Sequence, residues 1–535
     1  MNLKNMKSKA LYIVAVLSLC LPLSACAGDD TGENGGNGGG NPPIDYPETT
    51  TVNPKYNSTA LLRNPLNGWV MYTARDAALN YWDKETWVPE LNKNVRIIDY
   101  ASACYLRTSW ALLNPADGQY AWEDPNSHTG KLIRGALDRG LPIALRVVVD
   151  GRDQGMNTPR FVFDAGAEYY LENANQPNWR TPYPQDPVFR KYYEKFIEAL
   201  AKEFNDPKKC AFIDAYGLGK WGEGHNVVYE PGNKVTERTE ALKEETMQWI
   251  TKLYARYFTK IPLVINYHRH IGHPVSDGAS ASPNSERLLG IAIENGYCLR
   301  SDAFGMNNAS WGYSSWEKNF AAKWAYKLPI LMEGGYIVSS HSYWNDDAGY
   351  RQGHPEDVRK GEFDSSREAR VNMMDFRYGN ETYNWFETSY ALVQQFIAEG
   401  GYRLYPEQVA LPTSVNSGSK VKISHRWRNM GWGYFPNNIP QWNYKYKVAF
   451  ALLDGNGSAK AVYVDKESEP SKWWQNIPVS YDFVTDVKLP AGTYKWAVAL
   501  VDTQDGNAPA IKLAVNGTLT GEGWLELMNV EVKPE

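Results

Sequence analysis

Between residues 60 and 404, short apolar runs alternate with longer segments whose apolar residues recur at helical spacing. The apolar runs are dense in hydrophobic residues, which is typical of parallel strands covered by helices. Strands are predicted at residues 67–72, 101–110, 142–150, 210–219, 262–268, 298–305, 329–335 and 382–387. Helices are predicted between them, for example at 189–204 and 241–258. Eight such units predict a (β/α)8 TIM barrel of α/β class, with a doubly wound open sheet as the alternative.

The pattern changes after residue 404. Short strand-like runs follow one another, separated by Gly, Pro and Asn turns, and the long helical period disappears. This pattern predicts a C-terminal antiparallel β-sandwich at 405–535, so that the barrel domain spans 53–404.

The first 26 residues have the layout of a secretory signal, with three lysines followed by an apolar run too short to span a membrane comfortably. The end of this segment, Leu23–Cys26, resembles the bacterial lipobox, which implies cleavage before Cys26 and lipidation of its thiol. An ordinary cleaved signal peptide is the alternative. Residues 27–52 are Gly-rich and polar, which predicts a flexible tether. Asp29 and Asp30 resemble the surface-export signals of Bacteroidetes lipoproteins, so we expect an outer-membrane or cell-surface lipoprotein that faces outward and is bound to the membrane through Cys26.

The net charge and the amino-acid composition of the chain restrict the kinds of molecule that it can be expected to bind. The net charge of -5 argues against a nucleic-acid partner, which requires a basic face. The chain has 20 Trp and 35 Tyr, residues that suit either stacking on sugar rings or a large aromatic core. Cys104, Cys210 and Cys298 lie in apolar runs, are odd in number and are widely spaced, so we expect buried thiols.

The segment 211–225 contains Gly217, Gly219 and Gly222 in G-x-G-x-x-G spacing. A dinucleotide-binding fingerprint needs a strand before these glycines and a helix that starts on them. The following residues contain Pro231 and Gly232 and show no helical period, so the helix is missing. The glycines instead favour a strand end where the backbone is crowded, and no cofactor is implied.

Two glutamates stand just beyond predicted strands. Glu223 follows the fourth strand and Glu333 the seventh, and in a barrel the carboxyl ends of the strands carry the catalytic groups. A carboxylate is costly in an apolar environment unless it has a task or a partner. Two carboxylates that face each other across a cleft are the groups that glycoside hydrolysis requires, whereas the structural alternative is that each pairs with a nearby arginine.

Several segments together resemble clan A glycoside hydrolases. The segment 105–124 is similar to the second-strand region of β-galactosidase-like enzymes in families 42 and 35, and residues 401–438 look like a β-domain of unknown function that accompanies such barrels in Bacteroidetes. The resemblance implies that Glu223 is the acid/base, that Glu333 is the nucleophile and that Arg107 orients the nucleophile. To act as an acid, Glu223 needs a raised pKa in the free enzyme, which the negative charge of Glu333 can help supply. Gly222 departs from the pattern, because clan A enzymes usually have Asn immediately before the acid/base.

The remaining site candidates are aromatic residues and histidines near predicted strand ends, and no metal site is predicted because no carboxylate completes one. Stacking or hydroxyl-binding roles are assigned to Trp110, Trp221, His225, His268, His270 and Trp385. Asp150 and Asp302 also stand at strand ends and are alternative acids or hydroxyl-binding groups.

The sequence therefore predicts a retaining glycoside hydrolase that cleaves a β-linked oligo- or polysaccharide. A non-catalytic glycan-binding lipoprotein on a degenerate barrel is the alternative that Gly222 keeps open. A structural scaffold, in which the sandwich only packs against the barrel, is a third hypothesis.

Overall fold

The computed structural model describes residues 45–151, 155–275, 278, 280–306, 311–337 and 349–535. The predicted signal, lipobox and tether up to residue 44 lie outside the described residues. Residues 46–535 form one compact unit.

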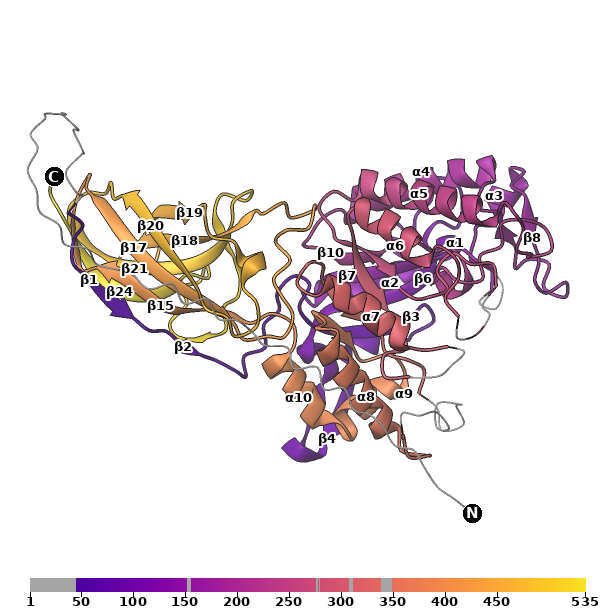
Figure 1. The fold of residues 1–535 in the computed structure, drawn as a ribbon, viewed down its shortest axis with the longest axis horizontal. Coiled ribbons are helices and arrows are strands. Elements are labelled where there is room, and N and C mark those ends of the chain that lie inside the picture. The colour runs from indigo at the N-terminus through magenta and orange to yellow at the C-terminus, as the bar shows by residue number, and fades with distance from the viewer. Residues whose placement is uncertain (1–44, 152–154, 276–277, 279, 307–310, 338–348) are drawn as a thin grey trace, which may run out of the picture. The chain divides into compact units, whose positions relative to one another are not determined.

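The first part of this unit is a closed barrel of eight parallel strands, which confirms the predicted fold (Figure 1). Its strands are β3 (Gly68–Ala74), β6 (Ala101–Ser109), β7 (Ile143–Val148), β10 (Cys210–Asp214), β11 (Leu263–Asn266), β12 (Tyr297–Ser301), β13 (Ile330–Met332) and β14 (Met373–Asp375). The helices in the same part of the chain are α1 (Trp110–Leu113), α2 (His128–Asp138), α3 (Arg160–Asp164), α4 (Pro187–Phe204), α5 (Thr239–Tyr257), α6 (Ser285–Glu294), α7 (Ser315–Trp324), α8 (Pro355–Glu368), α9 (Asn380–Glu387) and α10 (Tyr390–Glu399).

The eighth strand is not where the sequence pattern placed it. Residues 382–387 form most of α9, and the strand is β14, only three residues long. The run is dense in aromatic residues, which favours a strand, but Thr382, Trp385 and Phe386 are buried at the i, i+3, i+4 spacing of a helix.

The C-terminal part consists of two main β-sheets that share one apolar core. Their strands are β1 (Thr49–Val52), β15 (Leu404–Pro412), β17 (Lys420–Asn429) and β20 (Val479–Asp486) in one sheet, and β16 (Ser414–Asn416), β24 (Leu525–Lys533), β21 (Gly492–Asp502), β18 (Tyr446–Leu453), β19 (Ala459–Asp465) and β22 (Ala508–Ile511) in the other. Pairing is antiparallel except between β16 and β24. Short pairs elsewhere are β2 (Lys55–Tyr56) with β23 (Val515–Asn516), β4 (Glu85–Val88) with β5 (Lys93–Arg96), and β8 (Tyr169–Tyr170) with β9 (Thr181–Pro182).

The N-terminal strand belongs to the β-sandwich and not to a tether. β1 pairs with β15 from Thr49↔Pro412 to Val52↔Val409. The chain therefore contributes a strand to the sandwich before it enters the barrel, and the predicted tether overlaps this strand at residues 49–52.

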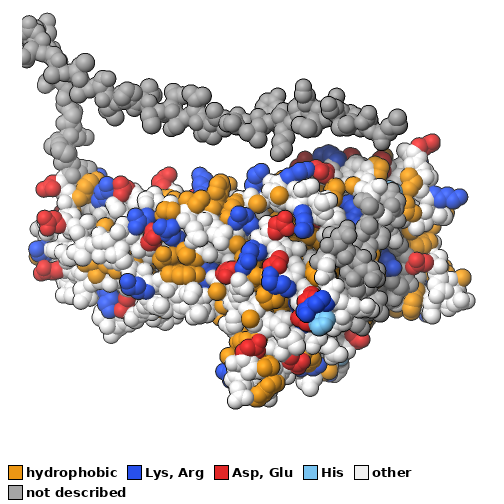
Figure 2. Space-filling model, turned by 60° about the horizontal axis from the view of Figure 1, so that its bottom comes forward, with side chains coloured by type: hydrophobic (Ala, Val, Ile, Leu, Met, Phe, Trp, Pro, Cys, Tyr) orange, Lys and Arg blue, Asp and Glu red, His pale blue; other side chains and the backbone are white. Residues whose placement is uncertain are grey.

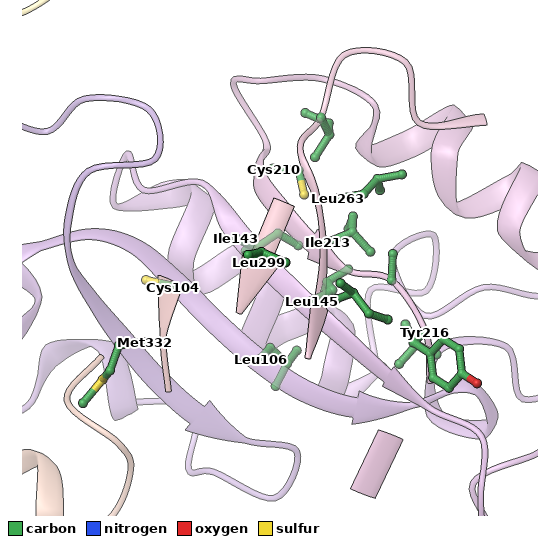
Figure 3. Packing of buried hydrophobic residues seen from close by; sticks show 14 of the residues in the cluster. Cys104, Leu106, Ile143, Leu145, Cys210, Ile213, Tyr216, Leu263, Leu299 and Met332 are labelled. Carbon is green, nitrogen blue, oxygen red and sulfur yellow. The ribbon is translucent and has the colours of Figure 1, made fainter. Parts of the chain in front are cut away.

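Alternation along the barrel strands separates two apolar regions. Residues such as Leu106, Ile143 and Leu299 point outward and pack in the cluster that includes the helices (Figure 3). Their inward-facing neighbours include Ala103, Ala144, Phe212, Val264, Cys298, Leu331 and Met373. These inward residues form one continuous apolar cluster with the core of the sandwich. Cys104, Cys210 and Cys298 are buried free thiols, as predicted.

On the face drawn in Figure 2, acidic and basic side chains of the described residues are interspersed. Such a surface presents a mixed field to a charged partner.

Candidate active site

Along the barrel strands, the inward-facing apolar residues are followed, toward the carboxyl ends, by inward-facing polar residues. TIM-barrel interiors are usually filled by branched apolar side chains. Here the corresponding layer contains polar side chains that are at most 2% exposed, namely Tyr72, Tyr105, Arg146, Asp214, Asn266, Arg300, Glu333 and Asp375. Because buried charges require partners, this layer must be an ion-pair network or the floor of a functional site.

Arg146 on β7 connects three of the carboxylates in this layer and just above it. Its Nε donates to Oδ2 of Asp214 over 2.8 Å, and its Nη1 donates to Oε1 of Glu223 over 2.9 Å. Its Nη2 donates to Oε2 of Glu333 over 2.6 Å. One guanidinium group therefore bridges the glutamates that follow the fourth and seventh barrel strands.

Glu333 is bound at both oxygens. Oε2 accepts hydrogen bonds from Arg146 and Arg300, and Oε1 accepts from Arg377 over 3.1 Å and from the hydroxyl of Tyr72 over 3.2 Å. Burial opposes ionisation, but the charges of these arginines outweigh burial and hold the pKa of Glu333 well below its usual range. Glu333 is therefore a fixed carboxylate.

Arg107 does not orient Glu333 by hydrogen bonding, contrary to the expectation from the family resemblance. Among the described residues, its one ion pair joins its Nη1 to Oε1 of Glu223 at 4.0 Å. The orienting arginines are instead Arg146, Arg300 and Arg377. Arg107 faces the cavity described below.

The loop that carries Glu223 depends on its glycines. Gly217, Gly219, Gly222 and Gly224 all have φ of +76°, in the region that only glycine adopts freely. A Cβ on Gly217 would lie 2.4 Å from the carbonyl oxygen of Val147, which is closer than real Cβ atoms approach other heavy atoms. This crowding agrees with the interpretation of the glycine spacing as a strand end.

The carboxyl of Glu223 is ionised in the free protein. Burial alone raises its pKa, but the hydrogen bond from His225 and the charge of Arg146 outweigh burial and lower the pKa to about 2. The Nε2 of His225 lies 3.5 Å from Oε2 of Glu223. The raised pKa expected for an acid at this position is thus not found.

A cavity of about 680 Å³ lies above the polar layer. The residues that line it are Arg107, Lys220, Trp221, Glu223, His225, Asn226, His268, Arg269, His270, Asp302, Ala303, Trp311, Gly312, Gly334, Gly335, Tyr336, Arg377 and Tyr378. Glu333 is absent from this set of described residues, so Glu223 reaches the cavity and Glu333 lies beneath it. A cavity of this size suits a small ligand or a few sugar rings.

Two of the three site histidines hold loops in place as well as lining the cavity. His268 Nε2 donates to the backbone carbonyl of Glu223 over 2.7 Å, and His268 Nδ1 accepts from the backbone N–H of His270 over 3.2 Å. Burial lowers the pKa of His268 to about 4, so this ring is neutral near pH 7. His270 Nε2 contacts the carbonyl of Gly278 at 2.9 Å.

The three candidate tryptophans fall into two groups. Trp221 lines the cavity, and its φ of +57° is unusual for so bulky a residue, which is typical of functional sites. Trp110 and Trp385 are both in the hydrophobic core, at 0% and 1% exposure. Trp110 packs against Tyr193, and Trp385 packs edge-on against Trp69. The structure therefore does not bring Trp110 or Trp385 to the cavity, because both are packed in the core that the barrel strands share with the helices.

The two strand-end aspartates also differ. Asp150 accepts hydrogen bonds from Thr181 over 3.1 Å and from Tyr170 over 3.3 Å, and it lies outside the large cavity. Asp302 follows β12 and lines the cavity. Burial, together with the charges of Glu223 and Glu333, raises the pKa of Asp302 well above its usual range.

Sequence reasoning missed most of the polar layer, including Arg146, Arg300, Asp214, Asp375 and Arg377. The signal was present, because charged residues at inward positions of otherwise apolar strands are costly unless they are paired. Alternation by twos from Ala144 to Arg146 and from Cys298 to Arg300 places both arginines on the inward face.

None of the helices formed by the described residues has the length and apolar character that crossing a membrane requires. The described residues also bring no three His, Cys, Asp or Glu side chains together in a metal-binding arrangement.

No family model and no curated protein matches the chain. Among solved structures, the endo-β-1,4-mannanase from Thermotoga petrophila aligns with 88% of this chain and 99% of its own, at 11% identity and a TM-score of 0.39. The catalytic domain of β-amylase from Paenibacillus polymyxa aligns with 63% of this chain and 98% of its own, at 11% identity and a TM-score of 0.40. Endo-glycoceramidase II from Rhodococcus sp. aligns with 81% of this chain and 100% of its own, at 10% identity and a TM-score of 0.36. These TM-scores are too low to support an inference, and the barrel is established by its own strand order.

Proposed function

We propose that the chain is a retaining glycoside hydrolase that cleaves a β-linked glycan. The observation that carries this proposal is the bridge that Arg146 makes between Glu223 and Glu333. These carboxylates come from the ends of the fourth and seventh barrel strands and meet at the floor of one cavity. Glycoside hydrolysis requires two such carboxyl groups on either side of the scissile bond.

The electrostatics suit Glu333 for the nucleophile. A carboxylate that attacks an anomeric carbon must be ionised, and the arginines around Glu333 keep it so. Its position beneath the cavity requires that the sugar ring settle onto the cavity floor. Glu223 reaches the cavity as a carboxylate and is suited to stabilise positive charge on the sugar ring or to accept a proton from water.

The walls of the cavity support a carbohydrate ligand. Trp221, Trp311, Tyr336 and Tyr378 all line it, and aromatic faces combined with polar tips suit the apolar faces and hydroxyls of sugar rings. Tyr336 is 56% exposed and is the most accessible of these four residues.

A screen of natural polysaccharides with chromatography of the products tests this proposal. The wild type should release oligosaccharides or monosaccharides from at least one β-linked glycan, and Glu223→Gln should not. Glu230→Gln is the matched control, because Glu230 lies in the same loop but is paired with Arg238 at 2.9 Å. If no glycan is cleaved, or if both variants lose activity equally, the proposed role of Glu223 is wrong.

A second candidate function is glycan binding without hydrolysis. It is favoured by the position of Glu333, whose two oxygens are occupied by protein donors and which lies outside the cavity lining. Gly222, in place of the usual Asn, points in the same direction. Calorimetric titration with glycans that the screen leaves uncleaved separates this function from hydrolysis, and the absence of any glycan binding would favour a structural scaffold.

We also propose that Cys26 is lipidated and anchors the protein at the outer membrane or cell surface, facing outward. The support is the Leu-Ser-Ala-Cys sequence at residues 23–26, which lies outside the described residues.

A further inference from the structure

Asp302 is the carboxyl group in the cavity that the protein leaves unbound. It stands directly after β12, the sixth barrel strand, and lines the cavity together with Glu223. Within the described part of the chain, Asp302 has no hydrogen bond and no ion pair with another residue. A polar group in such a position normally has a hydrogen-bond partner. Because the Asp302 carboxyl has none among the described residues, it is available to a ligand.

The other two carboxylates of the site lack this freedom. Glu223 is bound by Arg146 and lies beside His225, whereas Glu333 is bound by three arginines and Tyr72. Each therefore accepts hydrogen bonds from fixed donors, and donors aimed at a carboxylate oppose its protonation. A proton donor at this cavity must come from a different residue.

The surroundings of Asp302 favour its neutral form. Burial is the largest cause of its raised pKa, and the charges of Glu223 and Glu333 act in the same direction. Arg146 and Arg377 act in the opposite direction and are outweighed. Pairs of carboxyl groups whose surroundings separate their pKa values are the usual arrangement for acid and base roles in one active site.

We propose that Asp302 donates the proton to the leaving group in the hydrolysis proposed above, on which this inference rests. In the first step the Asp302 carboxyl gives its proton to the glycosidic oxygen as the bond between that oxygen and the anomeric carbon breaks. The carboxylate of Glu333 forms a new bond to the anomeric carbon, and the leaving group departs as an alcohol.

In the second step water attacks the anomeric carbon, and the bond to Glu333 breaks. The water proton passes to the Asp302 carboxylate, which restores the starting state of the site. The net reaction consumes one glycoside and one water. Glu223 remains a carboxylate throughout and stabilises the positive charge that develops on the sugar ring.

Leaving-group dependence tests this assignment. A nitrophenol leaves without a proton, whereas a sugar or alkyl alcohol does not. Asp302→Asn should lose about 10²- to 10⁴-fold in kcat/KM on the alkyl glycoside and less than about tenfold on the nitrophenyl glycoside. Glu223→Gln should lose activity to a similar extent on both substrates. Asp150→Asn is the matched control, because Asp150 is a strand-end aspartate outside the cavity. This variant should keep the wild-type ratio of kcat/KM between the two glycosides.

Two further measurements guard against a purely structural effect. The wild-type pH profile should lose activity as pH rises through the pKa of Asp302, and this basic limb should disappear in Asp302→Asn on the nitrophenyl substrate. Infrared difference spectra near pH 7 should show a carboxylic-acid C=O band that the variant lacks. Asp302→Ala serves as a second variant, and both should melt close to the wild type.

The outcomes distinguish the two proposals. If the wild type cleaves neither glycoside nor any glycan, hydrolysis fails and the Asp302 step fails with it. If the wild type is active but Asp302→Asn loses activity equally on both substrates, or not at all, hydrolysis stands and the Asp302 assignment is overturned.

Discussion

Nη2 of Arg146 lies 2.6 Å from Oε2 of Glu333, and at 0% and 1% exposure both side chains are shielded from water. The same guanidinium binds Asp214 and Glu223, so one cation compensates a large part of the negative charge in the barrel interior. An ion pair of this kind is expensive to break, because the partners that remain cannot be resolvated.

Removal of Arg146 should therefore destabilise the protein strongly. We expect Arg146→Ala to lower the free energy of unfolding by about 3–5 kcal/mol, measured by urea denaturation. Arg160→Ala is the control, because the Arg160 side chain is 78% exposed and pairs with Asp164 on the surface, and it should change stability by less than about 0.5 kcal/mol. Equal effects of the two substitutions would contradict the buried network.

A second prediction concerns pH and Glu381 on α9. Oε1 of Glu381 accepts the backbone N–H of Ile337 over 3.0 Å, and burial raises the pKa of Glu381 to about 7. Between pH 4.5 and 7 the folded protein thus holds a proton that the unfolded chain releases, so stability from this group is present at low pH and is lost as pH rises.

Glu381→Gln replaces the carboxyl by an amide that keeps the acceptor oxygen and does not titrate. Relative to the wild type, the variant should be more stable at pH 8 than at pH 5, by about 1–3 kcal/mol in the free energy of unfolding. Urea denaturation at the two pH values measures this difference. A variant whose stability relative to the wild type is the same at both pH values would show that Glu381 titrates normally.

The architecture was predictable, because seven of the eight barrel strands overlap the dense apolar runs from which strands are predicted. The β14 strand was missed, since three residues give too short a run and the aromatic residues of α9 imitate a strand. Glu223 and Glu333 were found because each follows a strongly apolar strand.

The chemistry around these glutamates was less predictable. The pKa of Glu223 depends on Arg146 and His225, and the contact to Arg146 joins residues 77 positions apart. The spacing of residues along the sequence does not reveal such a contact. Burial of Trp110 and Trp385 was also hidden, because an aromatic side chain beside a strand end can point toward the cavity or into the helical layer.

A third prediction concerns Gly222, which stands where the clan A glycoside hydrolases that the sequence resembles usually have Asn. A Cβ at this position would lie 3.4 Å from Cδ of Arg146, an ordinary contact, and Asn accepts positive φ more readily than most residues. Gly222→Asn should therefore fold and lose at most about 1 kcal/mol of stability.

Gly217→Asn is the matched comparison, since Gly217 has the same φ of +76° but its Cβ would meet the Val147 carbonyl oxygen at 2.4 Å. We expect it to lose at least about 2 kcal/mol more than Gly222→Asn, because the backbone must shift. Thermal melting and urea titration compare the stability of the two variants. If Gly222→Asn is the more damaging change, the loop is packed differently from the structure described above.

A fourth prediction concerns Cys26 and the cell envelope. Without the thiol at Cys26 no lipid can be attached, so Cys26→Ser should move the protein from the membrane fraction to the soluble fraction of the cell. Equal partitioning of the wild type and the variant would contradict the anchor. Surface exposure is a separate property, which protease treatment of whole cells measures.

The last prediction concerns the covalent step at Glu333. If Glu333 forms the glycosyl intermediate, Glu333→Ala should have no measurable turnover on either good or poor leaving groups, because no intermediate can form. The shortened side chain leaves a space beside Arg146 and Arg300. An azide ion can enter this space, and its negative charge would neutralise the positive charge of the two arginines. Azide should then attack the anomeric carbon of a nitrophenyl glycoside in place of the carboxylate.

Stereochemistry distinguishes this step from other causes of lost activity. Azide that enters from the side of Glu333 inverts the anomeric centre once, so a β-glycoside should yield an α-glycosyl azide, identified by the proton NMR coupling at the anomeric carbon. Asp302→Asn should give the opposite result, because its intermediate on Glu333 still forms and azide then attacks from the other side to yield the β-glycosyl azide. A folded Glu333→Ala protein that retains turnover without azide, or that yields the β-azide, would remove Glu333 from the covalent step.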